Sequence, residues 1–234
     1  MKLLYTDAYD FRKTIHEDTD AIYVKGGDGT LLTAINKFAH LGLPFFGIAG
    51  GTLNFLMNNR VGPVDGGILP DATHFEVQTM DINVTSNRQD IGGGNFVSLV
   101  STYNAFNDIV LGNFNVFTEF TCTHEDDQLG TFKGCGVVVS TAQGSTGINR
   151  NNNGTILPLS SPNWSVTGMQ TNRTVNSVIA PTELVIDCKG RKTTRIGIDG
   201  SNHELDDVSS IKITPGKPVT IIINDVDGFN KRRQ

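Results

Sequence analysis

Residues 1–70 alternate between short apolar runs and segments whose apolar residues recur at helical spacing. Apolar runs at residues 1–5, 21–25 and 43–49 are typical of strands, whereas residues 7–18 and 30–42 have the patterns of a polar and an amphipathic helix. Strand–helix–strand alternation predicts a parallel sheet with helices on its faces and right-handed crossovers. We therefore expect an N-terminal Rossmann-like α/β domain.

A different pattern begins at about residue 73, after a connector rich in glycine and proline. Strand-like segments, several with alternating apolar and polar residues, lie at 73–87, 96–106, 114–124, 130–140, 182–189, 194–200 and 209–225. Residues 87–95, 124–130 and 214–218 are typical of hairpin turns. The pattern predicts an all-β domain, a β-sandwich, over residues 73–224.

The α/β domain is then expected over residues 1–72. The closing KRRQ, residues 231–234, is interpreted as a solvated tail, and residues 225–234 are allowed to pack back on the α/β domain. The fold class is therefore α/β plus all-β.

Charge and composition narrow the class of protein. A net charge of −5 and a pI of about 5.5 differ from the basic face of nucleic-acid-binding proteins, so we expect no nucleic-acid partner. Residues 1–13 lack the apolar core of a signal peptide, and the most apolar segment, residues 41–57, is interrupted by a proline and four glycines, so no membrane span is expected. Scattered cysteines without a C-x-x-C pair favour a reducing compartment and argue against a disulfide framework or a zinc site: Cys122, Cys135 and Cys188. We expect a cytoplasmic protein.

Two glycine-rich loops follow predicted strands, at the edge where parallel-sheet proteins bind ligands. GGDGT, residues 26–30, surrounds Asp28 with glycines, and GIAGGTLNFLMN, residues 47–58, follows the next strand. The first loop lacks the Lys-Ser/Thr pair of a Walker A loop and the third glycine of a dinucleotide fingerprint. The simpler alternative is a pair of turns in which Asp28 and Asn54 cap the helices that follow.

Two polar stretches lie within the predicted β domain. In NAFNDIV, residues 104–110, Asn107 could bind a base edge and Asp108 ribose hydroxyls, although a plain Asx turn has the same pattern. The loop at 137–158 exposes many N–H and O–H donors that suit phosphate or ribose oxygens, and its alternative is a long polar surface loop. The donors cluster at Ser140, Thr141, Gly144, Ser145, Thr146 and Gly147.

Taken in order, these four stretches resemble the motifs of the NAD kinase family. The chain supplies GGDGTLL, GGTLNFL, FNDIV and STAQGSTG, followed by NRTVNSVIAP at residues 172–181 and IDG at 198–200. The resemblance covers nearly the whole chain. It implies an α/β domain joined to a β-sandwich, and transfer of the γ-phosphoryl group of ATP to the 2′-hydroxyl of the adenosine ribose of NAD, which makes NADP.

The resemblance also implies a role for the carboxylate in the first glycine loop. Asp28 is expected to be the general base that accepts the proton of the ribose hydroxyl as that oxygen attacks phosphorus. Mg²⁺, or another divalent cation that enters with ATP, would offset the charge of the phosphates, and no protein ligand of the metal is identified. The implied partners are NAD and ATP, and the implied assembly is a homodimer or homotetramer.

Individual substrate contacts follow from the same resemblance. Phe55 is expected to line the nucleotide pocket, Asn107 to hold the adenine and Asp108 a ribose hydroxyl. The full set of implied contacts is Gly26, Gly27, Gly29, Thr30, Phe55, Asn107, Asp108, Lys133, Cys135, Ser145, Thr146, Gly147, Ile148 and Asn151. Because the chain is acidic, phosphates need local cations, and the candidates beside the motifs are Lys133, Lys25, Arg150 and Arg173.

Three positions depart from the family pattern. Ile148 stands where the family usually has a tyrosine, Cys135 where an aspartate is common, and Asn54 where a glycine is found. The resulting GTLN is similar to a turn of diacylglycerol and sphingoid lipid kinases. Two alternatives therefore stay open: a lipid or other small-alcohol kinase of the same superfamily, and a non-catalytic dinucleotide-binding protein.

Overall fold

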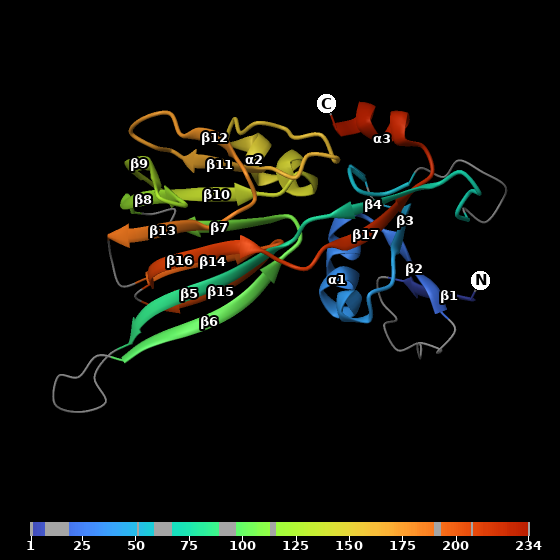
Figure 1. Ribbon diagram of the computed structural model, residues 1–234, viewed down its shortest axis with the longest axis horizontal. Coiled ribbons are helices and arrows are strands. Elements are labelled where there is room, and N and C mark those ends of the chain that lie inside the picture. The colour runs from blue at the N-terminus through green and yellow to red at the C-terminus, as the bar shows by residue number, and fades with distance from the viewer. Residues whose placement is uncertain are drawn as a thin grey trace. The chain divides into compact units, whose positions relative to one another are not determined.

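The chain forms two compact units in the computed structural model (Figure 1). The structure describes residues 2–7, 19–50, 52–58, 67–88, 97–112, 116–189, 193–206 and 208–233. Unit 1 comprises Met1–Val77, Pro158–Ser160 and Pro218–Gln234, and unit 2 comprises Gln78–Leu157 and Ser161–Lys217. Each unit is built around its own sheets.

Unit 1 contains a five-stranded sheet in the order β1-β2-β3-β17-β4. Neighbours from β1 to β17 pair in parallel, and β4 is antiparallel to β17. The strands are β1 (Lys2–Asp7), β2 (Thr19–Gly26), β3 (Phe45–Ala49), β17 (Val219–Ile223) and β4 (Thr73–Val77). The helical segments are α1 (Asp28–Phe38), η1 (Ala39–Leu41) and α3 (Val226–Arg233).

The helix α1 forms where the apolar spacing predicts it. Leu31, Ala34, Ile35 and Phe38 recur at i, i+3, i+4 and i+7, and all four are buried. A glycine in the left-handed region, Gly42 with φ of 69°, follows η1 and ends the helical segment. The chain can therefore turn directly into β3.

The boundary predicted from the sequence needs correction. The range 73–224 included the strands β4 and β17, yet both belong to the sheet of unit 1, where Ile221 pairs with Phe45 on one side and Phe75 on the other. The reason is that the VTIII run of β17 is apolar on both faces, which suits the middle of a parallel sheet rather than a half-exposed sandwich strand. Residues 214–218 are accordingly a connection between units and not a hairpin turn.

The interpretation of the C-terminus as a solvated tail is also wrong. Residues 226–233 form the helix α3, and Phe229 and Arg233 are buried in unit 1. The predicted helix at 7–18 lies outside the described residues except for Asp7, which ends β1. The predicted turn at 87–95 also lies outside them, apart from the end of β5.

Unit 2 contains two six-stranded sheets in which every neighbouring pair of described strands is antiparallel. The first sheet has the order β6 (Val97–Ala105), β5 (Met80–Arg88), β16 (Val208–Pro215), β13 (Leu184–Lys189), β8 (Thr118–His124) and β9 (Asp127–Gly134). The second has the order β12 (Asn176–Ile179), β11 (Trp164–Met169), β10 (Gly136–Ser140), β7 (Asp108–Gly112), β14 (Thr193–Ile198) and β15 (Ser201–Asp206).

Side chains from both sheets meet in one apolar core, so unit 2 is a β-sandwich. On β10, Val137 and Val139 face this core, whereas Val138 packs on the other side with Val110, Met169 and Ile148. The second face is covered because the chain continues from β10 into η2 (Gln143–Thr146) and α2 (Ile148–Asn151). The predicted fold class, α/β plus β-sandwich, is confirmed. No helix among the described residues has the length and apolar character of a membrane span.

Candidate functional site

The carboxylate of Asp28 joins the two glycine-rich loops of unit 1. The strand β2 ends at Gly26, Gly27 is extended, and α1 begins at Asp28. The two carboxylate oxygens accept backbone N–H bonds from Phe55 at 2.9 Å and Leu56 at 2.8 Å. These two bonds fix the orientation of the carboxylate. Each oxygen can accept a second hydrogen bond, so the side chain can still bind a ligand.

The alternative interpretation of Asp28 as a helix cap is wrong. The N-cap residue is Gly27, and no side chain caps this helix end. Asp28 lies in the first turn of α1, where a negative charge interacts favourably with the helix dipole. Asn54 has φ of 55° and lies in a turn, and no helix follows it within residues 55–58.

Glycine is required where the two loops touch. A Cβ atom on Gly26 would lie 2.5 Å from the hydroxyl oxygen of Thr30, so any side chain there would displace the start of α1. Gly50 donates its N–H to the carbonyl of Gly26 at 2.7 Å, and a Cβ atom on Gly50 would lie 3.2 Å from the Gly26 Cα. The loops therefore pack backbone against backbone. By contrast, Gly29 has open space around it.

In unit 2, Asp199 organises the turn between β6 and β7. Its carboxylate accepts backbone N–H bonds from Phe106 at 2.8 Å, Asn107 at 2.7 Å and Asp108 at 3.2 Å. Asp199 itself has φ of 49° and, with Gly200, makes the turn between β14 and β15. Burial raises the pKa of Asp199, and the three backbone hydrogen bonds act against that rise. The IDG motif is thus a structural clamp on the FNDIV motif.

The loop after β10 clamps the same turn from another side. The hydroxyl of Thr141 donates to the Phe106 carbonyl at 2.8 Å, and the amide of Gln143 donates to that carbonyl at 2.6 Å. A Cβ atom on Gly144 would overlap the carbonyl oxygen of Asn107, so glycine is required there. These contacts hold the backbone of Asn107 and Asp108 rigidly.

Two buried acceptors lie side by side in this turn. The side-chain oxygen of Asn107 is buried without a donor among the described residues. Asp108 is 5 % exposed, and its pKa is raised to about 7, first by burial and second by the charge of Asp199. Buried polar groups are usually hydrogen-bonded, so the unpaired Asn107 oxygen beside a buried carboxyl group indicates a site for a ligand that carries donors.

A satisfied network beside this pair shapes the following loop. Asn149 is fully buried, donates to the carbonyls of Ser145 and Thr155, and accepts bonds from the hydroxyls of Ser165 and Thr167. These bonds fix the backbone on both sides of Gly147, whose nearest neighbours include the Asp108 carboxylate. Asn149 was not among the predicted site residues, and its place within the motif-rich loop was the only signal for it.

The structure groups some of the predicted residues and separates others. Asn107, Asp108, Ser145, Thr146, Gly147 and Ile148 gather around the β6–β7 turn, with Arg150 and Asn151 exposed on α2. Cys135 precedes β10 and therefore lies roughly 20 Å along the strand from Thr141, at about 3.3 Å per residue. Its thiol donates to the Gln170 side-chain oxygen at 3.1 Å.

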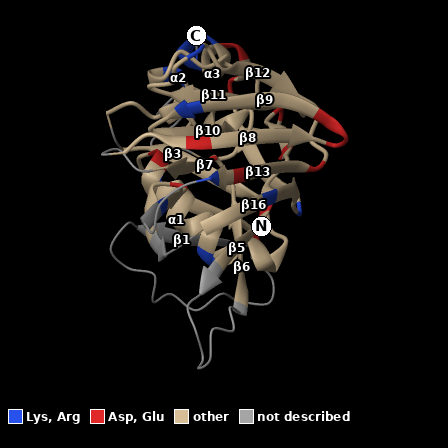
Figure 2. Cartoon of the chain, turned by 90° about the vertical axis from the view of Figure 1, so that its left-hand side faces the viewer, with Lys and Arg blue, Asp and Glu red and all other residues tan. Residues whose placement is uncertain are grey.

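The predicted cations of unit 2 also lie apart from that turn. Lys133 pairs with Glu119 at 3.7 Å, near Cys135. Arg173 lines a small cavity of about 130 Å³ with Cys122, Gly130 and other residues of the sandwich. Figure 2 colours the acidic and basic residues along the chain, including the basic residues of α3 and the acidic residues of the β8–β9 turn. In unit 1, Lys25 is exposed at the end of β2.

Known proteins are similar to this chain in its fold and in the segment that contains the two glycine-rich loops. The family model described as "ATP-NAD kinase N-terminal domain" matches residues 5–63. The NAD kinase of Rickettsia akari is 31 % identical over 147 residues, which cover 62 % of this chain and 54 % of the relative. The chain thus matches about half the length of that relative.

Two solved structures share the fold. Yeast NADH kinase complexed with NADH has a TM-score of 0.73 at 19 % identity, over 92 % of this chain and 64 % of that one. An NAD kinase from Archaeoglobus fulgidus in complex with ATP has a TM-score of 0.70 at 14 % identity, over 99 % of this chain and 96 % of that one. The chain therefore shares its α/β plus β-sandwich fold with these two structures. The chain is thus similar to NAD kinases in the part that the family model matches and in its fold.

Proposed function

We propose that this protein is an NAD kinase, which transfers the γ-phosphoryl group of ATP to the 2′-hydroxyl of the adenosine ribose of NAD. The observation that carries the proposal is the unpaired, buried side-chain oxygen of Asn107 next to the buried carboxyl group of Asp108. An adenine amino group can donate to the Asn107 oxygen, and ribose hydroxyls can donate to the Asp108 carboxylate. The similarity to NAD kinases supports the same substrate.

The proposal assigns the general base to Asp28. Its carboxylate is held by the N–H groups of Phe55 and Leu56, and the remaining lone pairs can accept the proton of an attacking hydroxyl. We assign no protein ligand to Mg²⁺, which would enter the site with the phosphates of ATP. When bound, Mg²⁺ offsets the negative charge that develops on those phosphates.

The other contacts are divided by position. Thr146, Gly147 and Ile148 border the adenosine, since they follow the loop that clamps Asn107 and Asp108. Lys133 and Cys135, at the far end of β10, are assigned to the half of the dinucleotide distant from the adenosine. Within the remaining predicted set, Phe55 lines the nucleotide pocket, and Arg150, Arg173 and Lys25 stay candidates for phosphate contacts.

A coupled assay for NADP tests the proposal. Wild-type protein with NAD, ATP and Mg²⁺ should form NADP, and Asp28→Asn should lower the rate by about 10²–10⁴-fold, the usual range for a general base. The matched control is Asp71→Asn, the same change at an exposed position of unit 1, which should keep full activity. Because an amide cannot accept both N–H bonds, thermal unfolding of Asp28→Asn must be measured alongside.

The outcomes separate the candidate functions. NAD binding without turnover in the wild type would identify a non-catalytic dinucleotide-binding protein. Phosphorylation of a lipid or small alcohol in place of NAD would identify another kinase of the superfamily. Neither binding nor phosphorylation of NAD would refute the proposal.

We also propose a cytoplasmic homodimer or homotetramer. Large apolar side chains are exposed on edge strands, with Val100 on β6 63 % exposed and Val178 on β12 44 % exposed. Such positions are typical of surfaces that pair with another copy. Light scattering of the purified protein measures the assembly directly, and a monomer would contradict this part of the proposal.

A further inference from the structure

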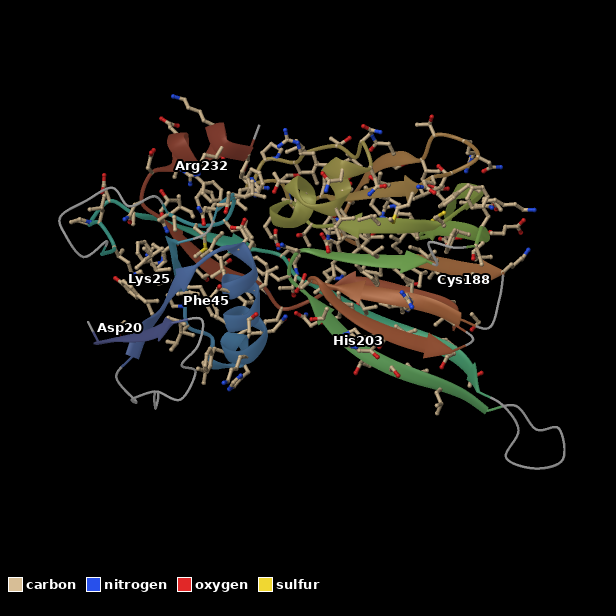
Figure 3. All side chains as sticks on the ribbon, turned by 180° about the vertical axis from the view of Figure 1, so that it is seen from behind. Asp20, Lys25, Phe45, Cys188, His203 and Arg232 are labelled. Atoms are coloured by element: carbon tan, nitrogen blue, oxygen red, sulfur yellow. The ribbon has the colours of Figure 1, made fainter. Side chains whose placement is uncertain are left out.

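The C-terminal helix α3 brings two arginines into unit 1. Asp225 begins this helix by accepting the N–H of Gly228 at 2.9 Å, and Phe229 is fully buried. The guanidinium groups of Arg232 and Arg233 lie 5.6 Å and 5.7 Å from the centroid of the Phe229 ring. Figure 3 labels Arg232 on this helix. The aromatic anchor therefore holds both cations against the unit.

Arg232 contacts the loop that Asp28 organises. One terminal nitrogen, Nη2, donates to the carbonyl of Met57 at 2.8 Å, next to Leu56, whose N–H binds Asp28. The other donors, Nε and Nη1, are buried and have no acceptor among the described residues. Buried N–H donors without an acceptor cost free energy unless an anion accepts their hydrogen bonds.

A second arginine of α3 is buried close to the same loop. Arg233 is 3 % exposed, and burial lowers its pKa to about 10 while the charge of Asp28 acts to raise it, so it is a cation at neutral pH. The charge of Asp28 thus acts on Arg233, and the Asp28 oxygens also accept bonds from backbone N–H groups. The acidic residues at the start of α3, Asp225 and Asp227, are exposed. The partly buried Arg232 and the buried Arg233 therefore bring two cations close to the loop that Asp28 organises.

We propose that Arg232 is an anion subsite that takes a phosphate group of a polyphosphate donor. The inference rests on the proposed function, because it places that donor beside the loop of the assigned base. The unused Nε and Nη1 donors lie on different edges of the guanidinium, each can donate to an anion oxygen, and the Met57 bond fixes the plane of the guanidinium. The ligand class is a nucleoside triphosphate or inorganic tripolyphosphate.

Calorimetry with inorganic tripolyphosphate tests the subsite. Arg232→Gln should weaken binding by about 10–100-fold, as expected for the loss of charge-assisted hydrogen bonds. The matched control is Lys231→Gln, which removes the same charge from an exposed position of the same helix and should change affinity less than about threefold. Arg232→Lys keeps the charge but not the planar set of guanidinium donors, and should give an intermediate affinity.

A stability measurement separates a ligand site from a purely structural arginine. If Arg232 awaits an anion, tripolyphosphate should raise the Tm of the wild type and of Lys231→Gln but not that of Arg232→Gln. Arg232→Gln should also keep the Tm of the ligand-free protein, because it removes a buried charge with unused donors. A large loss of Tm without ligand, together with unchanged tripolyphosphate affinity in Arg232→Lys, would overturn the subsite.

The subsite and the proposed function fail in different ways. If NADP is not formed from NAD but tripolyphosphate binding still depends on Arg232, the subsite stands and the proposed acceptor is wrong. If NADP is formed and both the KM for ATP and the tripolyphosphate affinity are unchanged in Arg232→Gln, the kinase stands and the subsite is refuted.

Discussion

Asp108 should reduce the stability of the protein at neutral pH, and its replacement by asparagine should relieve this cost. The carboxyl group is 5 % exposed, and its pKa is raised from 3.8 to about 7 by burial and by the charge of Asp199. A pKa difference of about three corresponds to on the order of 4 kcal/mol between the two protonation states. Asp108→Asn removes the titration while it keeps the shape of the side chain.

The sign of the pH dependence follows from linkage. A carboxyl group with a raised pKa in the folded state binds more protons when folded than when unfolded between about pH 4 and pH 7. Its contribution to stability is fully present below about pH 4 and is lost as the pH rises through about 7. The free energies of unfolding of Asp108→Asn and wild type should therefore agree near pH 4, and the variant should be more stable by up to a few kcal/mol at pH 8.

Urea unfolding at pH 4, 6, 7 and 8 measures this difference. Trp164 is the single tryptophan of the chain and is fully buried in the core of unit 2, so its fluorescence reports the unfolding of the unit that contains Asp108. Asp126→Asn, at the exposed tip of the β8–β9 turn, is the control and should leave the pH profile unchanged. Parallel profiles for Asp108→Asn and wild type, or a variant less stable at pH 8, would refute the reasoning.

The same substitution should weaken NAD binding, since an amide oxygen is a poorer acceptor than a carboxylate for ribose hydroxyls. Gain of stability with loss of affinity is the expected behaviour of a residue kept for function. Equal NAD affinity in Asp108→Asn and wild type would remove Asp108 from the proposed substrate site while leaving the stability argument intact.

Other changes test the clamps around this turn and the glycine loops. Asp199→Asn removes the charge of Asp199, the second cause of the raised pKa of Asp108, so that pKa should fall. A ¹³C NMR titration of the Asp108 carboxyl group measures it, and an unchanged pKa would contradict this cause. Gly144→Ala places a Cβ atom against the carbonyl of Asn107 and should cost about 1–3 kcal/mol in urea unfolding. Gly29→Ala, which meets open space inside α1, should instead stabilise by about 0.5–1 kcal/mol, and equal effects of the two alanines would refute the packing argument.

Local patterns were enough to predict the elements near the glycine loops. The spacing of Leu31, Ala34, Ile35 and Phe38 predicted α1, and the structure buries all four. The position of GGDGT between a strand and a helix likewise followed from neighbouring residues in the chain. The cap interpretation of Asp28 was wrong because its partners, Phe55 and Leu56, lie 27 and 28 residues away.

Strand pairings and hydrogen bonds between residues far apart in the chain could not be predicted from local sequence patterns. The VTIII run of β17 was predicted to be a strand of the sandwich. Its continuous apolar character is closer to that of β3 than to that of an alternating strand such as β9. The IDG motif was noticed only as part of a resemblance, and its role as a clamp on residues 106–108 required knowledge of contacts across more than 90 residues. The basic C-terminus was predicted to be a solvated tail because its own residues do not reveal the hydrogen bond from Arg232 to the Met57 carbonyl.

The sequence by itself determined the fold class, the α1 helix, the order of the motifs and the family that they resemble, because apolar periodicity and turn residues act over a few neighbouring positions. Only the tertiary structure decided which sheet receives β17, which backbone groups Asp28 and Asp199 hold, and where the arginines of α3 lie. Strand pairing and side-chain burial depend on partners far apart in the chain, and many pairings are compatible with the same local pattern. The buried acceptors of Asn107 and Asp108 became visible only when those partners were in place.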